Sequence, residues 1–395
     1  MKLTHNGILT FFRYILFEKP KFIIVALLLT GFTACANSTT NKVDSIPEVP
    51  QPPDTITLIF AGDVMQHLTQ INGVKTADGS YDYTATHEHV KNEILSADMG
   101  LANLEVPLAG KPYSGYPLFS APDEIALALK DIGFSVLVTA NNHSCDKGMK
   151  GVERTITMLD SFNIHHTGMF RNQEERDSRY PLNIEVKGIK MSVLDYSYGT
   201  NGLPVYKPYI INLIDTVQII KDIEKAKQSN PDIIIACMHW GVEYQMLPNK
   251  EQKQLTEMLF NHGVNLIIGA HPHVIQPMEK RCDSTGRCDK LVAYSLGNFV
   301  SNQPFENSDG GALLKLKLVK DSIGAHITWA GYSLLWVHKP KIDGRTRHYI
   351  LPAADYYENN TLSAEFQKQL NLFVNNARKI FNKHNVDINE YRIEH

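Results

Sequence analysis

Short apolar runs rich in β-branched residues alternate along the chain with segments whose apolar residues recur at helical spacing. TITLIFAGD (55–63) is one of these runs, and it ends in a polar residue, as buried strands often do. EIALALKDIGF (124–134) has the spacing of an amphipathic helix. Because strands that alternate with helices build layered sheets, the pattern predicts an α/β fold. Further strands are predicted at 98–106, 135–143, 190–199, 232–241, 265–273 and 290–300, and further helices at 151–164 and 250–264.

The pattern changes in the last part of the chain. Segments 310–321 and 325–337 alternate apolar and polar residues, so we expect two antiparallel strands beside the main sheet. Residues 363–395 are polar and mostly helical in pattern. The chain is therefore predicted to have one layered domain over 56–338 and a mostly helical C-terminal extension over 339–395.

The N-terminal residues differ from the rest. A stretch with lysines and an arginine precedes the apolar run FIIVALLLTGFTAC, which is too short to span a membrane and is typical of a secretory signal. Cys35 follows this run directly, as in bacterial lipoprotein signals, although Phe32 stands where those signals usually carry Leu. We predict a lipoprotein-type signal peptide over 1–35 with lipid attachment at Cys35; an uncleaved anchor and a secreted protein without lipid are the alternatives. Residues 36–55 are rich in Ser, Thr, Pro and Asn, which predicts a flexible tether.

Charge and cysteine usage narrow the function classes. The formal net charge is −3, so no basic excess indicates nucleic-acid binding. An anionic polymer would need a local basic patch or a metal ion. Cys282 and Cys288 enclose a polar turn and are predicted to form a disulfide in an oxidising compartment, with two free thiols as the alternative. Cys145 and Cys237 are interpreted as small core residues.

Five of the predicted strands end in side chains that bind metal ions. In α/β sheets ligands bind outside the carboxyl ends of strands, so these residues are expected to converge although they lie far apart in sequence. A mixture of carboxylate, amide and imidazole ligands suits Zn, Mn or Fe, and the lack of cysteine among them argues against a structural zinc site. The predicted metal ligands are Asp63, Glu105, Asn142, His239, His271 and His273.

Taken singly, these residues have structural alternatives. Asp63 fits a helix cap, Asn142 a left-handed turn, and His239 a hydrogen-bonded core histidine. The metal interpretation therefore depends on their conjunction. The HPH sequence at 271–273 adds to it, because residues two apart in a strand point to the same face. Both imidazoles are expected to face one centre or two adjacent ions.

Six motifs occur in order between residues 56 and 303: FAGDVM, NLE, TANNHSCDKG, MHWGVEY, GAHPHVIQP and YSLGNFV. Together they resemble the CapA family, which is associated with poly-γ-glutamate capsule biosynthesis. The fold of that family is similar to the calcineurin-like metallophosphoesterases. The resemblance implies a layered, metallophosphatase-like β-sandwich flanked by helices, with the site at the carboxyl ends of the strands.

The resemblance also implies roles for individual residues. It matches Asp63 to the first aspartate of the superfamily and Glu105 to its metal-bridging aspartate. Met65 stands where the superfamily carries a histidine, and His67 nearby is a candidate replacement. These departures favour one tightly held metal ion over a full dinuclear site. The remaining matches are Asn142 and His143 for its Asn-His pair, His239 for its lone histidine, and His271 and His273 for its final Gly-His-x-His, here with Ala270 inserted after Gly269.

Two neighbours of these motifs are candidate catalytic residues. Asp146 lies three residues after His143, where its carboxylate would orient the imidazole and make His143 a general acid or electrostatic stabiliser; a helix cap is the alternative for Asp146. Glu243 is a candidate general base or substrate contact. Trp240 is interpreted as a core residue, and Tyr244 as a pocket wall or a core residue. The predicted catalytic residues are thus His143, Asp146 and Glu243.

Residues and resemblance together predict an envelope-anchored, metal-dependent hydrolase or transferase. It would act in the synthesis, anchoring or export of an anionic capsule polymer such as poly-γ-glutamate. The alternatives are a non-catalytic, metal-containing polymer-binding or assembly factor and a phosphoesterase. The expected partners are the anionic polymer or a small phosphorylated or γ-glutamyl substrate, the membrane through a lipid anchor, and capsule-synthesis membrane proteins, with no nucleic acid. The expected location is the cell envelope, lipid-anchored and periplasmic or surface-exposed.

Overall fold

The computed structural model describes residues 54–394. The predicted signal peptide with Cys35 lies outside these residues, as does nearly all of the tether predicted over 36–55. Within 54–394, no helix is both long enough and apolar enough to cross a membrane.

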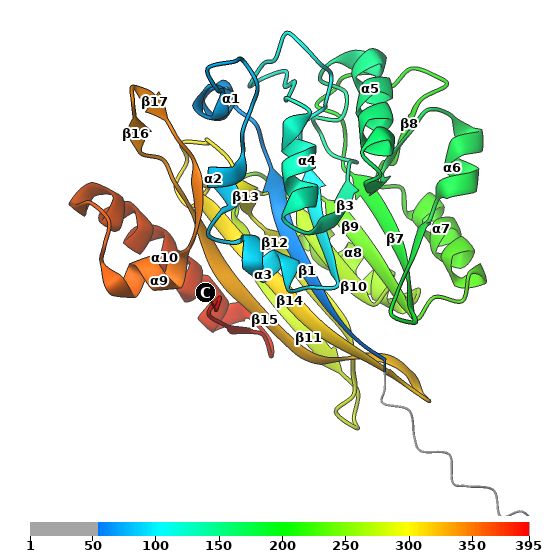
Figure 1. Ribbon diagram of the computed structural model, residues 1–395. Coiled ribbons are helices and arrows are strands. Elements are labelled where there is room, and N and C mark those ends of the chain that lie inside the picture. Colours follow the sequence, from blue (N-terminus) through cyan, green and yellow to red (C-terminus); the bar gives the residue numbers. More distant parts are fainter. Residues whose placement is uncertain (1–53, 395) are drawn as a thin grey trace, which may run out of the picture. The chain divides into compact units, whose positions relative to one another are not determined.

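The N-terminal part of the described chain builds four parallel strands, which lie side by side in chain order (Figure 1). All residues of the second strand are buried, as its continuous apolar sequence predicts for a strand covered on both faces. The strands are β1 (Asp54–Val64), β2 (Met99–Leu104), β3 (Phe134–Val138) and β4 (His165–Thr167). The helices between them are α1 (Leu68–Val74), α2 (Thr84–His87), α3 (Lys91–Leu95), α4 (Glu124–Asp131) and α5 (Gly148–Ser161).

The middle of the chain builds a second group of parallel strands, and its parallel pairs run in the order β7 (Ile189–Ser197), β9 (Ile233–His239), β10 (Leu266–Ala270) and β12 (Cys288–Leu296). β6 (Leu182–Val186) is antiparallel to β7, and β11 (Ile275–Cys282) is antiparallel to β12. A disulfide between Cys282 and Cys288 joins β11 to β12. The helices here are α6 (Gln173–Arg179), α7 (Thr216–Gln228) and α8 (Lys250–Asn261).

Two long antiparallel strands connect these two groups. β14 (Gly310–Asp321) pairs with β1 and with β15 (Gly324–His338), and β15 reaches β12 through the single pair Cys288 and Ile327. The predicted antiparallel direction is confirmed, but the predicted position is wrong. The two strands occupy the centre of the sheet rather than its side, because β14 pairs with the edge of β1 opposite β2. Alternation of apolar and polar residues along a strand does not indicate the position of that strand in the sheet.

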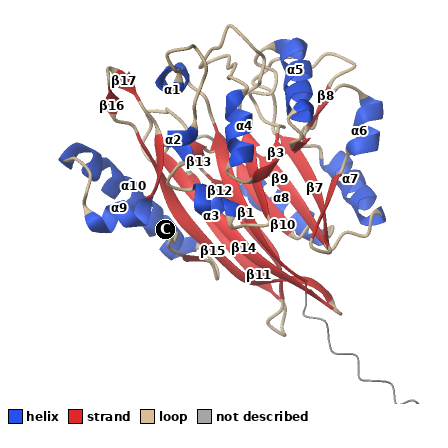
Figure 2. Cartoon of the chain, viewed as in Figure 1, coloured by secondary structure: helices blue, strands red, loops and turns tan. Residues whose placement is uncertain are grey.

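The two groups of parallel strands share one apolar core. It contains Phe60 and Leu101 from the first group and Val193, Ile235 and Ile268 from the second, all of them buried. The outer face of each group packs on helices: α4 covers β1–β3, and α7 and α8 cover β7, β9 and β10 (Figure 2). The described strands and helices therefore confirm the predicted α/β layers, with a sandwich of strands flanked by helices.

The C-terminal residues pack against the same core. β18 (Tyr349–Pro352) pairs with β15, and α10 (Ala364–His384) buries Phe373 and Phe381 in the core shared by the two strand groups. The segment after 339 is thus part strand and part helix. The remaining elements are β5 (Met169–Phe170), β8 (Ile210–Ile211), β13 (Asn298–Val300), β16 (Lys341–Ile342), β17 (Arg345–Thr346), α9 (Ala353–Asn359) and β19 (Asn389–Glu390).

Candidate metal centre

Ends of strands from both groups meet at one place. Asp63 lies near the end of β1, His239 ends β9, and Glu105 follows β2 directly. The approach of β1 to β13 requires a glycine, since a Cβ on Gly62 would lie 1.9 Å from the carbonyl oxygen of Gly297. The amide of Asp63 donates to that same carbonyl at 2.9 Å, which fixes the aspartate beside the loop that follows β12.

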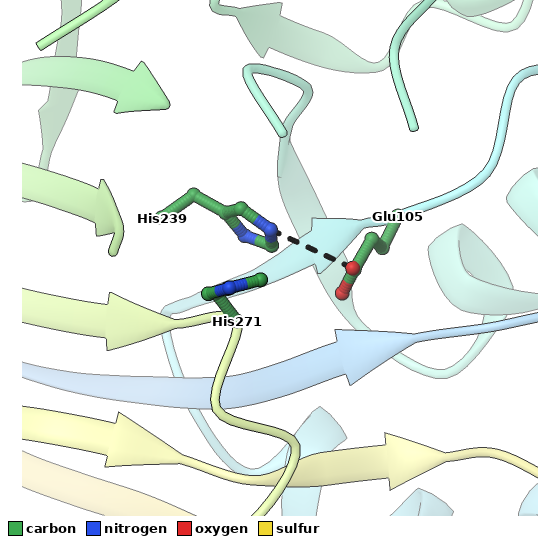
Figure 3. Close-up of side chains that lie close together, drawn as sticks. All are labelled: Glu105, His239 and His271. Atoms are coloured by element: carbon green, nitrogen blue, oxygen red, sulfur yellow. Dashed lines mark ion pairs between the residues drawn. The ribbon is translucent and has the colours of Figure 1, made fainter. Parts of the chain in front are cut away.

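Glu105, His239 and His271 form the group drawn in Figure 3, and all three are buried. Their candidate ligand atoms lie within 4.8 Å of one another, and Nε2 of His239 is 3.5 Å from Oε1 of Glu105. Oε1 of Glu105 and Nδ1 of His271 have no hydrogen-bond partner among the described residues although both atoms are buried. Buried polar atoms rarely stay without partners, so this pair of orphaned ligand atoms fits a bound cation.

Asn142 lies at the same group. Its side-chain oxygen is 2.8 Å from Nε2 of His239, and its amide nitrogen donates to Asn201 at 3.4 Å. The amide oxygen and the imidazole nitrogen therefore point to a common place. With Glu105 and His271, this makes two imidazoles, one carboxylate and one amide oxygen, a set that suits Zn, Mn or Fe.

A second group contains Asp63, Glu105 and His273, so Glu105 belongs to both. Here Asp63 is engaged by the protein itself. It accepts hydrogen bonds from the side chain of Asn103 at 2.8 Å and from the backbone N–H of His271 at 3.2 Å, and it lies 3.1 Å from Nδ1 of His273. All six predicted metal ligands are thus brought together, with two of the groups sharing one carboxylate.

The HPH segment reaches the site by a different route from the predicted one. β10 ends at Ala270, and His271 and His273 have φ values of 94° and 57°, in the left-handed region. The prediction that they lie in strand geometry is therefore wrong. Both rings still approach the site, with centroids 6.0 Å apart, because the loop turns after the strand instead of extending it.

Burial shifts the pKa values of the candidate metal ligands. Burial lowers the pKa of His239 well below its ordinary value and that of His271 to about 3, so both imidazoles are neutral at pH 7 and able to bind a metal. Burial and the nearby Asp63 raise the pKa of Glu105 well above its ordinary value. Burial also opposes ionisation of Asp63, but His273, His239 and the hydrogen bond from Asn103 together outweigh it and lower the pKa of Asp63. A divalent cation would stabilise the ionised form of Glu105.

His143 and Asp146 lie beside the metal ligands as a pair. Nδ1 of His143 is 2.8 Å from Oδ2 of Asp146, which also accepts the backbone N–H of Phe119 at 2.8 Å. Asp146 therefore orients the imidazole, which is one of the two roles predicted for it. The alternative role, a helix cap, does not apply to α5, because the cap of α5 is Lys147. Both residues line a cavity of about 610 Å³ that also reaches His273 and Glu243.

Glu243 differs from the other site residues because it is exposed. It forms a third group of candidate ligands with His271 and His273. Tyr244 lines the cavity, whereas Trp240 is buried and donates to the carbonyl of Tyr294 at 2.9 Å, as expected of a core residue. Cys145 and Cys237 are buried free thiols, which fits their interpretation as core residues.

Met65 and His67 occupy the wall of the cavity. Met65 is buried there, and His67 is the cap of α1, where its Nδ1 lies 3.1 Å from the side chain of Gln70. His67 belongs to none of the candidate ligand groups within the described residues. Burial lowers the pKa of His67 to about 4, so its ring is neutral at pH 7. Because it lies in no ligand group of the described residues, the structure gives no support to His67 as a replacement ligand for the position of Met65.

Sequence reasoning missed several supporting residues. Asn298 is fully buried, and its side-chain oxygen lies 3.1 Å from Nδ1 of His273. Tyr198 packs its ring 4.5 Å from that of His271. Asp195 accepts the backbone N–H groups of Thr139 and Ala140 at 2.9 and 2.7 Å, which holds the loop that carries Asn142.

A sequence signal existed for two of these residues. Asp195 and Tyr198 lie at the end of the predicted strand 190–199, where polar side chains are expected to contribute to the site as they do at the other strand ends.

Burial raises the pKa of Asp195 to about 8, although the backbone hydrogen bonds lower it. A mostly protonated carboxyl at this position carries little charge toward the neighbouring ligands.

Comparison with known proteins fits this geometry. Residues 57–303 match the family described as bacterial capsule synthesis protein PGA_cap. The chain belongs to this family. The PGA_cap region contains every predicted metal ligand and every predicted catalytic residue, and the match confirms the resemblance carried by the six sequence motifs.

Two relatives of this PGA_cap protein share most of its length. The capsule biosynthesis protein CapA of Bacillus anthracis is 26% identical over 314 residues, which cover 76% of this chain and 73% of the relative. The PGA biosynthesis protein CapA of Bacillus subtilis (strain 168) is 28% identical over 315 residues, which cover 76% of each chain.

Among solved structures, the calcineurin-like phosphoesterase YfkN from Bacillus subtilis has a TM-score of 0.46 at 13% identity, covering 82% of this chain and 100% of that one. The NAD nucleotidase NadN of Haemophilus influenzae also has a TM-score of 0.46 at 13% identity, covering 86% of this chain and 65% of that one. Similarity at this level supports no assignment of activity.

Proposed function

We propose that this protein is a metal-dependent hydrolase or transferase that acts in the synthesis of a capsule polymer of the poly-γ-glutamate type at the cell envelope. Membership of the capsule synthesis family and the names of the two CapA relatives support the biological role. The observation that carries the chemistry is the buried group of Glu105, His239 and His271, which has two orphaned ligand atoms. Attachment through a lipid at Cys35 is part of the proposal and explains the location.

Glu105, His239 and His271, with the amide oxygen of Asn142, would hold one divalent ion. When bound, such an ion polarises a phosphoryl or amide carbonyl oxygen and lowers the pKa of water. The ligands fit such an ion. The imidazoles of His239 and His271 are neutral, and a bound cation would stabilise the ionised form of Glu105, which burial disfavours.

Other side chains of the site would act as general acid and general base. Asp146 fixes Nδ1 of His143, which leaves Nε2 as the ring nitrogen for a substrate in the cavity. That nitrogen can give a proton to a leaving group. Glu243, exposed at the cavity wall, is the candidate base for an attacking water or amine.

A non-catalytic polymer-binding or assembly factor is the second candidate. The observation that favours it is the second ligand group, where Met65 supplies no ligand nitrogen and Asp63 is already engaged by Asn103, His271 and His273. Such a centre would hold one ion and bind the polymer without turning it over.

Purified full-length protein separates these candidates. Metal content would be measured by mass spectrometry, and hydrolysis would be assayed on phosphodiesters and on γ-glutamyl peptides. We expect His239→Ala to lower metal occupancy and turnover, with the exposed His165→Ala as the matched control. Bound metal without turnover on either substrate class would contradict the enzyme and favour the binding factor. Unchanged occupancy in His239→Ala would contradict the ligand assignment.

A further inference from the structure

Within the described part of the chain, four aromatic side chains line the cavity beside the metal ligands, and two of them are largely exposed. Tyr116 is 77% exposed and Phe305 is 51% exposed, and both line the cavity together with Phe119 and Tyr244. The rings of Tyr244 and Phe305 lie 4.3 Å apart. Large aromatic rings left open to water around a cavity mark a binding surface, since burying them against a ligand is favourable.

Three histidines, His67, His143 and His273, are the basic side chains that line the cavity. Among the described residues that line it, none is lysine or arginine. Lys339 is not part of the lining; its ammonium group donates to the backbone carbonyl of Gln303 at 3.2 Å. A row of carboxylates or a phosphate chain would therefore find no lysine or arginine in this cavity, and only the metal centre and the imidazole of His143 as partners.

Two carboxylates, Asp146 and Glu243, line the cavity. Asp146 is occupied by His143 and by the backbone of Phe119. Glu243 is exposed and has no hydrogen bond or ion pair to any residue within 54–394. A divalent ion held by Glu105 would leave Glu243 as a carboxylate without a charge partner at the cavity wall.

We propose that this cavity binds the primary amine of a substrate, as an ammonium ion, with Glu243 as its charge partner and the rings of Tyr244 and Phe305 as its walls. A carboxylate next to aromatic faces is the arrangement that recognises organic cations, through an ion pair and cation–π contact. The inference rests on the proposed function and names its substrate: the amine is either the amino end of a γ-glutamyl chain or the amino group of a separate acceptor molecule. The lack of lysine and arginine in the described lining disfavours the carboxylates along the polymer.

Calorimetric titration of metal-loaded, full-length protein tests this proposal with three probes. They are γ-glutamyl-glutamate with a free amine, its N-acetyl derivative, and n-butylamine, which has an amine and no carboxylate. We expect the free-amine dipeptide to bind about tenfold more tightly than its N-acetyl derivative, as a charge-assisted hydrogen bond predicts. Binding of n-butylamine indicates a separate acceptor, and binding of the dipeptide alone indicates the amino end of the chain.

Glu243→Gln is expected to abolish the tenfold preference, while Glu251→Gln, an equal change on the exposed start of α8, is expected to keep it. The proposal is overturned if the N-acetyl probe binds as tightly as the free amine, or if the preference survives in Glu243→Gln. Metal content is measured on every sample. Full metal occupancy without amine preference refutes this inference and leaves the proposed function standing, whereas absent metal refutes the proposed function itself.

Discussion

Replacing Glu105 with Gln tests the metal centre because this residue belongs to two of the three candidate ligand groups. The change keeps the size of the side chain and removes the charge of the carboxylate. Oε1 of Glu105 lies 3.5 Å from Nε2 of His239 and 3.6 Å from Nε2 of His273, so one oxygen serves both groups. Altering residues around a metal site typically costs 10–100-fold in affinity. We expect losing this carboxylate to cost at least about 100-fold, or about 2.7 kcal/mol.

The same substitution should not weaken the metal-free protein. Burial and Asp63 raise the pKa of Glu105, so without a cation the wild type holds a carboxyl group that is costly to ionise. An amide carries no such cost. We therefore expect the metal-free variant to unfold at a temperature equal to or above that of the metal-free wild type, whereas added metal should stabilise only the wild type, by a margin of about 2.7 kcal/mol when the ion is present at 100 times its Kd.

Thermal unfolding of chelator-treated protein, with and without added Zn²⁺ or Mn²⁺, measures both effects. Glu251→Gln on the exposed face of α8 is the matched control and should respond to metal as the wild type does. If Glu105→Gln gains as much stability from metal as the wild type, Glu105 is not a ligand. If the metal-free variant is several kcal/mol less stable, its role is structural.

Three further predictions follow from single residues. His87 is buried without a hydrogen-bond partner for either ring nitrogen among the described residues, and burial lowers its pKa to about 4. Because the unfolded state binds a proton below about pH 6.5, the free energy of unfolding of the wild type should fall by about 3 kcal/mol between pH 6.5 and 4. Chemical denaturation of His87→Phe should show about 3 kcal/mol less loss of stability over the same range, and an equal loss in both proteins would contradict the prediction. Asp146→Asn should lower kcat about 10–100-fold on any turned-over substrate while metal content stays constant, because Asp146 contacts His143 and the backbone N–H of Phe119 and belongs to no candidate ligand group among the described residues; loss of metal would place Asp146 among the ligands instead. Gly62→Ala should cost about 1–3 kcal/mol or more of unfolding free energy, since the added Cβ meets the carbonyl of Gly297, and an unchanged melting temperature would show that β1 and β13 adjust freely.

The convergence of the site was predictable because one rule applied repeatedly. Each apolar run ended in a polar side chain, and the carboxyl ends of parallel strands meet at one edge. The rule needed no knowledge of which strands were neighbours, so Asp63, Glu105 and His239 were found although they come from different halves of the fold. The helices at 124–134, 151–164 and 250–264 were found for a similar reason, since their spacing is a local property.

Features that depend on tertiary packing were not predictable in this way. The central position of β14 depends on which edge of β1 is open, and no residue of β14 encodes that alone. The left-handed turn at His271 and His273 follows directly after the end of β10, and strand periodicity cannot show it. The contact between Asn298 and His273 joins the first residue of β13 to the loop after β10, and neither segment alone indicates it.

The most direct test of the account is anomalous X-ray scattering from crystals of the full chain grown with Zn²⁺ or Mn²⁺. The account predicts one anomalous peak bounded by Glu105, His239, His271 and the side-chain oxygen of Asn142, at ligand distances of about 2.0–2.2 Å. A map without a peak at this place, or with peaks only at surface carboxylates, would contradict the claim that this family member has a metal centre at the ends of its strands.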